Sequence, residues 1–240
     1  MLDTMRKIVK TGIVTEKWNE SAVPPRFRGG VLVKTEACSG CGNCTQLCPV
    51  GAIAMVSGRP VINNKLCIFC GRCQQGCHQG ALYHGSDFKL AEKREVMETG
   101  GILRKKISQL LGRSLAIRHV DVGSCNACDW EMAALGNPLY DLSQYGINFV
   151  ASPRHADMLM VTGMVTRNLT QALLKTYEAT PAPKLVVAVG SCATGGKTFG
   201  KSYAVRGSVD ALVPVDVYIP GCPPRPQALI HGLLMAVNRL

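Results

Sequence analysis

Residues 38–48 read CSGCGNCTQLC, and residues 67–77 read CIFCGRCQQGC. Both stretches have the form C-x2-C-x2-C-x3-C, and together they use eight of the 12 cysteines in this 240-residue chain. The second stretch repeats the first at an offset of 29 residues, and the match continues beyond it, where Gly51 corresponds to Gly80 and Ala52 to Ala81. Such a repeat predicts two similar loop–helix–strand units related by a pseudo-twofold axis.

This spacing is typical of bacterial-type ferredoxins with two 4Fe–4S clusters, in which the fourth cysteine of each run ligates the other run's cluster. The predicted ligands are Cys38, Cys41, Cys44 and Cys77 for the first cluster, and Cys67, Cys70, Cys73 and Cys48 for the second. Each repeat unit alone buries little apolar surface, so we expect the clusters to stabilise this α+β ferredoxin-like domain. Pro49 follows the first run, whereas His78 stands at the corresponding place after the second.

Disulfides and zinc are the competing interpretations of the two runs. Disulfides would need an oxidising compartment, and bridges within such tight runs are geometrically awkward. Zinc prefers two separated C-x2-C pairs over four thiolates in one short run. The doubled spacing therefore favours iron–sulfur clusters.

The formal net charge of the chain is +11, a value that first suggests a nucleic-acid partner. Only 5% of the residues are aromatic and no recognised nucleic-acid-binding motif occurs, so we expect no nucleic-acid function. We expect the basic residues to surround anionic thiolate-ligated clusters, to face an acidic partner or to face anionic lipid headgroups.

Composition also indicates the compartment. Hydrophobic residues make up 47% of the chain, which is ample for a packed core, but the longest apolar stretches are too short to span a bilayer. Residues 1–10 contain neither an apolar signal region nor a twin arginine, which predicts that the chain is not exported. Twelve cysteines in such a chain favour metal ligation in a reducing cytoplasm.

The chain divides into four predicted segments. Residues 1–30 form a basic lead that we expect to be an extended docking arm, with a partly disordered terminus as the alternative. Residues 31–85 form the two-cluster domain. Residues 86–116 are a predicted linker, with one helix over residues 89–97 and a basic amphipathic helix over residues 102–111. The second helix could lie on a membrane surface, in a partner's groove or on its own domain.

The fourth segment, residues 117–240, alternates between strand and helix patterns. Strands are expected over residues 117–122, 147–150, 158–161, 185–189 and 215–219, and helices over residues 129–135, 166–177 and 226–237. This alternation predicts an α/β domain with a mainly parallel, doubly wound sheet.

The remaining cysteines are Cys125, Cys128, Cys192 and Cys222, and all four lie just beyond the carboxyl ends of predicted strands. Open α/β sheets build their ligand sites at this edge, so the four thiols could converge on one 4Fe–4S cluster. Zinc is a competitor here, because a C-x2-C pair plus two further cysteines can be tetrahedral. The two neighbouring clusters favour a third cluster.

Three stretches carry a family resemblance: VGSCNACDWE (residues 122–131), SPRHAD (residues 152–157) and VDVYIPGCPP (residues 215–224). They resemble the small subunit of group 4 membrane-bound nickel–iron hydrogenases and formate hydrogenlyase-type complexes, a family related to the 20 kDa subunit of complex I. Residues 24–85, with PPRFRG before the cysteine runs, resemble the two-cluster ferredoxin-like subunit of the same complexes. The chain therefore looks like a fusion of two usually separate subunits.

The resemblance implies a flavodoxin-like C-terminal domain whose four cysteines hold the proximal 4Fe–4S cluster, which makes three clusters in all. It also implies a large partner subunit with the nickel–iron centre, so no catalytic residue is expected in this chain. Glu131 and His155 would lie at that interface or on a proton route. Their alternatives are a carboxylate favoured by a helix N-terminus and a histidine hydrogen-bonded for structure. Arg225 could donate to cluster sulfur or be a surface arginine.

These observations predict an oxidoreductase subunit that conducts single electrons. Electrons would enter from another iron–sulfur subunit, a soluble ferredoxin or a formate or CO dehydrogenase module, and would reach the nickel–iron site through the proximal cluster. The chain would be cytoplasmic, held at the membrane through membrane subunits of the complex. The alternatives are a nickel-free, complex I-like quinone oxidoreductase and a free ferredoxin-like carrier.

Overall fold

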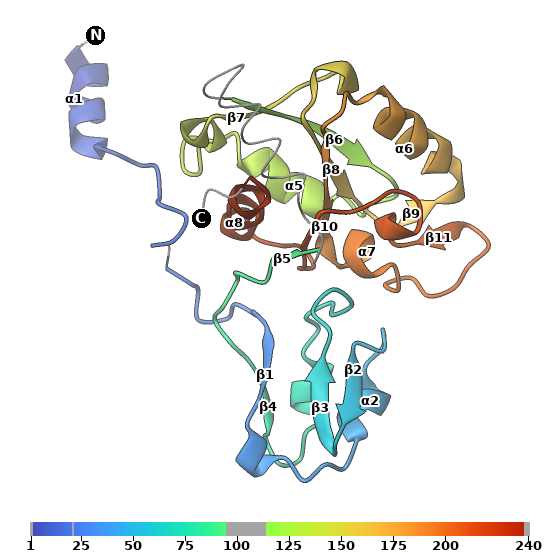
Figure 1. The fold of residues 1–240 in the computed structure, drawn as a ribbon. Helices are drawn as coiled ribbons and strands as arrows, with labels where there is room; N and C mark the ends of the chain where they lie inside the picture. The colour runs from blue at the N-terminus through green and yellow to red at the C-terminus, as the bar shows by residue number, and fades with distance from the viewer. Residues whose placement is uncertain (1, 21, 95–113, 238–240) are drawn as a thin grey trace.

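The computed structural model describes residues 2–20, 22–94 and 114–237. Figure 1 shows a small part that contains the two cysteine runs and a larger part built on a six-stranded sheet. Helix α1 (Leu2–Thr11) stands apart from both and buries none of its residues. Among these described residues, no helix combines the length and the apolar character that a membrane crossing requires.

The two cysteine runs fold into matching units. The first run leads through α2 (Asn43–Leu47) to β2 (Ile53–Val56), and the second leads through α3 (Arg72–Gln75) to β4 (Leu82–His84). Gly42 and Gly71 both take the left-handed conformation before their helices, with φ of 75° and 79°. Strand β2 pairs antiparallel with β3 (Arg59–Ile62), and β4 pairs antiparallel with β1 (Val31–Val33). The predicted repeat of loop, helix and strand is confirmed.

The helix that we predicted over residues 89–97 is wrong for its described part. Residues 89–94 contain no helix, and β5 (Glu92–Lys93) pairs antiparallel with an edge of the larger sheet. The Arg94 N–H extends this pairing by donating to the carbonyl of Asp216 at 2.9 Å. An unpaired sheet edge offers backbone hydrogen bonds that outweigh the helix propensity of this segment, because an isolated helix this short is only marginally stable. Residues 95–97 and the second predicted helix, over residues 102–111, lie outside the described residues.

The larger sheet has the strand order β5-β12-β10-β8-β6-β7. Its five parallel strands are β6 (Leu115–Asp121), β7 (Ile147–Phe149), β8 (Met158–Thr162), β10 (Leu185–Val189) and β12 (Val217–Ile219). All five coincide with predicted strands, and only β5, at one edge, runs antiparallel. The prediction of a mainly parallel α/β domain is confirmed.

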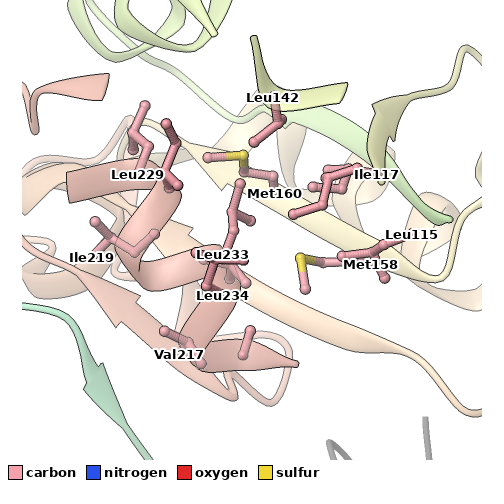
Figure 2. Packing of buried hydrophobic residues seen from close by; sticks show 14 of the residues in the cluster. Leu115, Ile117, Leu142, Met158, Met160, Val217, Ile219, Leu229, Leu233 and Leu234 are labelled. Carbon is pink, nitrogen blue, oxygen red and sulfur yellow. The ribbon is translucent and has the colours of Figure 1, made fainter. Parts of the chain in front are cut away.

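Helices cover both faces of this sheet (Figure 1). On one face, α5 (Ala127–Ala134) and α8 (Pro226–Ala236) pack onto a core that includes Met158 and Met160. Figure 2 shows Leu229, Leu233 and Leu234 of α8 in this core. On the other face, α6 (Arg167–Ala179) and α7 (Gly190–Gly195) pack onto Leu159 and Val161. Successive strand residues thus alternate between two apolar layers, which fixes the register of the buried strands.

Shorter elements complete the described chain. They are β9 (Val165–Thr166), β11 (Val205–Gly207), and the 3-10 turns Thr35–Ala37, Leu142–Tyr145, Pro153–His155 and Val209–Ala211. Strands β9 and β11 pair antiparallel with each other.

The segment after α1 contacts both parts of the chain. Thr15 Oγ1 donates to the carbonyl of Pro138 at 2.8 Å, and the Trp18 ring lies 5.4 Å from the ring of His231. Farther along, the Gly29 N–H donates to the carbonyl of Gly85 at 3.0 Å. This segment therefore packs against its own chain before it enters β1.

Candidate iron–sulfur sites

Two cavities in the small part are lined by the cysteines of both runs. The first cavity, of about 180 Å³, is lined by Cys38, Cys41, Cys44 and Cys77. The second, of about 20 Å³, is lined by Cys48, Cys67, Cys70 and Cys73. Each cavity therefore brings together three cysteines of one run and the fourth cysteine of the other. These are the two sets that the crossed-ligation prediction names, and iron ligation by them stays a prediction.

Apolar side chains enclose these sets. Met55, Pro60 and Leu82 line the first cavity, and Val31, Ile53 and Ile62 line the second. The small core of this part consists of Val31, Ile53, Cys73 and Leu82, with further cysteines of both runs packed against it. Cysteines thus stand where larger aliphatic side chains stand in an ordinary core, and the apolar lining would limit the access of water to a bound cluster.

Backbone N–H groups point at several of the sulfur atoms. The Ala52 N–H lies 3.2 Å from Cys48 Sγ, and the Ala81 N–H lies 3.3 Å from Cys77 Sγ. These two contacts are equivalent positions of the repeat. The Phe69 N–H donates to Cys67 Sγ at 3.4 Å. Such donors favour the thiolate form, and they tune the potential of an iron–sulfur cluster.

The pKa of the Cys77 thiol shows this effect. Burial raises its pKa, but backbone N–H groups of residues 79–82 more than offset the rise, so the pKa lies below its usual value. Cys67 behaves in the opposite way. Burial raises its pKa to about 11, and the nearby thiols of Cys73, Cys48 and Cys70 add to the rise. Thiols crowded in this way resist ionising together unless a cation binds them.

The third set lies where the sequence predicted it, beyond the carboxyl ends of the sheet strands. Cys125 and Cys128 follow β6, Cys192 lies in α7 directly after β10, and Cys222 follows β12. Burial raises the pKa of Cys128, and the thiols of Cys192, Cys222 and Cys125 raise it further. All four thiols therefore lie close enough to influence one another, although they come from three separate loops.

Gly190 allows this convergence. It has φ of +83°, and a Cβ atom at this position would lie only 2.5 Å from Cys128 Sγ. A larger residue would therefore be strained and would push the Cys128 sulfur away from its present place.

The donor sets fit 4Fe–4S clusters in number and chemistry, since each consists of four thiols in partly apolar surroundings. In the described part of the chain, no three or more His, Cys, Asp or Glu side chains form a group that could hold a metal ion. A 4Fe–4S cluster binds as a cage with one cysteine on each iron, so its ligands do not converge on a single point.

The second and third sets are neighbours. Cys222 is exposed overall, yet partial burial of its thiol raises its pKa, and the thiols that add to the rise are those of Cys192, Cys125 and Cys70 of the second run. Arg28 Nη1 donates to the carbonyl of Cys70 at 2.8 Å, and Phe69 lies in a cavity wall together with Cys222. Sequence reasoning missed Arg28 and Phe69, although Arg28 lies in the PPRFRG stretch that it singled out.

Hydroxyl groups of α7 join the two parts of the chain. Ser191 Oγ donates to the carbonyl of Cys67 at 2.6 Å, and Thr194 Oγ1 donates to the carbonyl of Lys65 at 2.7 Å. Lys65 Nζ lies 3.9 Å from the centre of the Tyr218 ring and 3.6 Å from Glu92 Oε2. Sequence reasoning missed these joining residues, because no local pattern marks a contact between distant loops.

Glu131 and Arg225 lie near the third set. Burial raises the pKa of Glu131, and the positive charge of Arg225 partly offsets that rise. The Arg225 guanidinium lies over the rings of Phe27 and Phe88, at 5.4 and 5.1 Å, and its Nε donates to Gln227 Oε1 at 2.7 Å. Arg225 is thus packed between the two parts of the chain, although Nη1 has no hydrogen-bond partner among the described residues.

His155 is exposed and lies in the turn that precedes β8, at the amino end of that strand. The cysteines of the third set follow the carboxyl ends of the parallel strands. The structure therefore does not bring His155 together with these cysteines, and its role at an interface stays a prediction.

Comparison with known proteins gives two family matches. Residues 125–236 match the model for the 20 kDa subunit of NADH ubiquinone oxidoreductase, and residues 30–85 match a 4Fe–4S dicluster domain. The two matched regions include all 12 cysteines.

Curated relatives include subunits of three kinds of complex. The probable membrane-bound hydrogenase subunit mbhJ of Pyrococcus furiosus is 48% identical over 58% of this chain and 84% of its own length. Formate hydrogenlyase subunit 7 of Escherichia coli is 41% identical over 60% of this chain, which spans 57% of that relative. A subunit of the NADH-quinone oxidoreductase of Clostridium beijerinckii is 52% identical over 47% of this chain and 68% of its own length.

These relatives are subunits of oxidoreductase complexes, and the dicluster match identifies an iron–sulfur domain in this chain. The chain belongs to the family of iron–sulfur electron-transfer subunits that includes membrane-bound hydrogenase subunit mbhJ and formate hydrogenlyase subunit 7, and that is related to the 20 kDa subunit of NADH ubiquinone oxidoreductase.

Proposed function

We propose that this chain conducts single electrons through three 4Fe–4S clusters to or from a nickel–iron site in a large partner subunit, where protons and hydrogen interconvert. The observation that carries the proposal is the arrangement of the 12 cysteines in three neighbouring sets, from the first cavity to the edge of the parallel sheet. Such a series would let an electron pass from the first set to the second and from the second to the third, which lies at the edge of the sheet.

A bound 4Fe–4S cluster supplies one-electron chemistry. The chain's own residues would hold, insulate and tune the three sites. Twelve thiols are the proposed ligands, namely Cys38, Cys41, Cys44 and Cys77, then Cys67, Cys70, Cys73 and Cys48, then Cys125, Cys128, Cys192 and Cys222. The N–H groups of Ala52, Phe69 and Ala81 would stabilise negative charge on the sulfur atoms.

A partner at the third set is supported by the exposed residues there. Cys125 and Cys222 are exposed, and Trp130, two residues after Cys128, is 76% exposed. Tryptophan is a common anchor of protein interfaces, because it buries a large apolar area while its N–H can still find a partner. A large subunit seated over this face would cover the third cluster, with Glu131 at its edge.

A nickel-free, complex I-like oxidoreductase is the second candidate. The 52% identity to the NADH-quinone oxidoreductase relative supports it. The C-x2-C spacing of Cys125 and Cys128 supports the hydrogenase, because it resembles hydrogenase small subunits, whereas the complex I subunit has two adjacent cysteines there. A free ferredoxin-like carrier is the third candidate, and the exposed third set argues against it.

Three further parts of the proposal follow the same resemblance. The domains would be a docking arm (residues 1–30), the two-cluster domain (residues 31–85), a linker (residues 86–116) and a flavodoxin-like domain (residues 117–240). The parallel strand order β7-β6-β8-β10-β12 supports the flavodoxin-like domain, since in sequence order it is the 2-1-3-4-5 arrangement of flavodoxin-like sheets.

The chain would lie on the cytoplasmic side of a membrane, held by membrane subunits. Another iron–sulfur subunit, a ferredoxin or a formate or CO dehydrogenase module would exchange electrons with it.

Nickel analysis of the purified complex separates the two enzymatic candidates. We expect nickel in the large subunit together with hydrogen evolution from a low-potential donor, since proton reduction would need the nickel–iron site. A nickel-free complex that reduces a quinone and evolves no hydrogen would contradict the hydrogenase proposal and favour the second candidate. Purification of the chain as a stable monomer with no partner would favour the third.

The crossed ligation can be tested with four single Cys→Ser variants, followed by electron paramagnetic resonance of the reduced protein. Cys41→Ser and Cys70→Ser identify the signals of the first and second sets. We expect Cys48→Ser to lose the signal that Cys70→Ser loses, and Cys77→Ser to lose the signal that Cys41→Ser loses, because the cavities group these cysteines in that way. Loss of the Cys41-dependent signal in Cys48→Ser would refute the crossed arrangement.

The third site can be tested through Gly190, without changing a ligand. Gly190→Ala should remove or distort the third cluster signal and leave the other two, because the added methyl group would meet Cys128 Sγ. Gly200→Ala is the matched control, since Gly200 also has a positive φ (+69°) but no atom lies within 4 Å of its added Cβ. Equal loss of the third signal in both variants would show that backbone strain alone is responsible, and an intact signal in Gly190→Ala would contradict the assignment.

A further inference from the structure

The buried hydroxyl of Ser191 lies between the second cysteine run and the third cysteine set. Ser191 is 2% exposed, and its Oγ donates to the carbonyl of Cys67 at 2.6 Å. The same Oγ lies 3.0 Å from the carbonyl oxygen of Gly221, which also accepts the Ser191 backbone N–H at 2.8 Å. One residue thus binds the backbone of two distant loops.

The chain neighbours of these contacts are proposed cluster ligands. Ser191 directly precedes Cys192, and Gly221 directly precedes Cys222. Each end of the hydrogen bonds between Ser191 and Gly221 is therefore one residue away from a proposed ligand of the third set. Cys67 is a proposed ligand of the second set. The hydroxyl therefore closes a route made of covalent bonds and one hydrogen bond, from the side chain of Cys67 through its carbonyl to Ser191 and on to Cys192.

We propose that Ser191 is the positioning residue that fixes the electron route between the second and third sites. The inference rests on the proposed function, because it needs a cluster at each site. One electron would leave the second site, which is oxidised, and reach the third, which is reduced, while no covalent bond forms or breaks and no proton moves. Ser191 acts through Cys67, Cys192 and Gly221 and touches no reacting atom of its own.

Thr194 provides an internal comparison. It lies one helical turn beyond Ser191 in α7, and its Oγ1 donates to the carbonyl of Lys65 at 2.7 Å. This bond also joins the two parts of the chain, and Thr194 is similarly buried, at 3% exposed. Lys65 is not a proposed cluster ligand. The Thr194 bond therefore helps to hold α7 against the loop of residues 63–70, here called the junction, but it does not connect one proposed ligand to another.

The experiment compares Ser191→Ala, Thr194→Val and Ser191→Thr in the intact, anaerobically purified complex. Hydrogen exchange of the backbone amides in residues 63–70 reports on the junction, and rapid freeze-quench electron paramagnetic resonance reports on how fast the third cluster is reduced after the second. We expect both Ser191→Ala and Thr194→Val to speed the exchange about fivefold, since each loses one hydrogen bond worth ~1 kcal/mol. Only Ser191→Ala should slow electron transfer from the second cluster to the third, by several-fold. Ser191→Thr, which keeps the hydroxyl, should transfer electrons at the rate of the unmodified complex.

The other results would overturn the inference. Equal slowing in Thr194→Val and Ser191→Ala would mean that the two bonds only hold the parts together, and an unchanged rate in Ser191→Ala would mean that the route does not depend on the hydroxyl. If Ser191→Ala lost a cluster, Ser191→Thr would have to regain both the cluster and the rate for the inference to stand. Failure of the proposed function gives a different result, because the unmodified complex itself would then show no third cluster.

Discussion

The free-energy cost of ionising crowded, partly buried thiols is the constraint on which the rest of this structure depends. In each of the three sets, burial raises thiol pKa values, and neighbouring thiols raise them further, as at Cys44, Cys67 and Cys128. Thiols in such surroundings are poor packing partners for one another as anions and are strong ligands for cationic iron. The arrangement therefore suits the binding of clusters, and the small part would depend on them most, since cysteines make up much of its core.

The two parts of the chain solve the problem of holding four thiols in different ways. The small part uses a tandem repeat, in which short helices and backbone N–H groups surround sets of three cysteines from one run and the fourth cysteine of the other. The larger part uses a parallel sheet, whose buried strands carry three distant loops to one edge. The two solutions meet at α7, where Ser191 and Thr194 bind the backbone next to the second run. The proposed relay would need this contact, because electron transfer requires a short and constant separation between sites.

Much of this architecture was predictable from the sequence, because local patterns determine it. The repeat offset, the five parallel strands and the position of the third cysteine set all follow from spacing and periodicity. The helix expected over residues 89–97 failed in its described part, because the backbone hydrogen bonds offered by β12 outweigh the helix propensity of so short a segment. Likewise, Arg28, Ser191 and the stacking of Arg225 between Phe27 and Phe88 depend on contacts between distant segments, which no local pattern encodes. His155 lies at the amino end of β8, whereas the third cysteine set lies at the carboxyl ends of the strands. This separation follows from the direction of the strand, which the SPRHAD motif does not reveal.

The most direct test of the account is the iron and acid-labile sulfide content of the anaerobically purified chain, measured together with its zinc content. Three 4Fe–4S clusters predict about twelve irons and about twelve sulfides for each chain, with no stoichiometric zinc. A content of about eight irons would mean that one of the three sets holds no cluster. Stoichiometric zinc in place of iron would contradict the account altogether, since the thiols would then hold a structural metal that transfers no electrons.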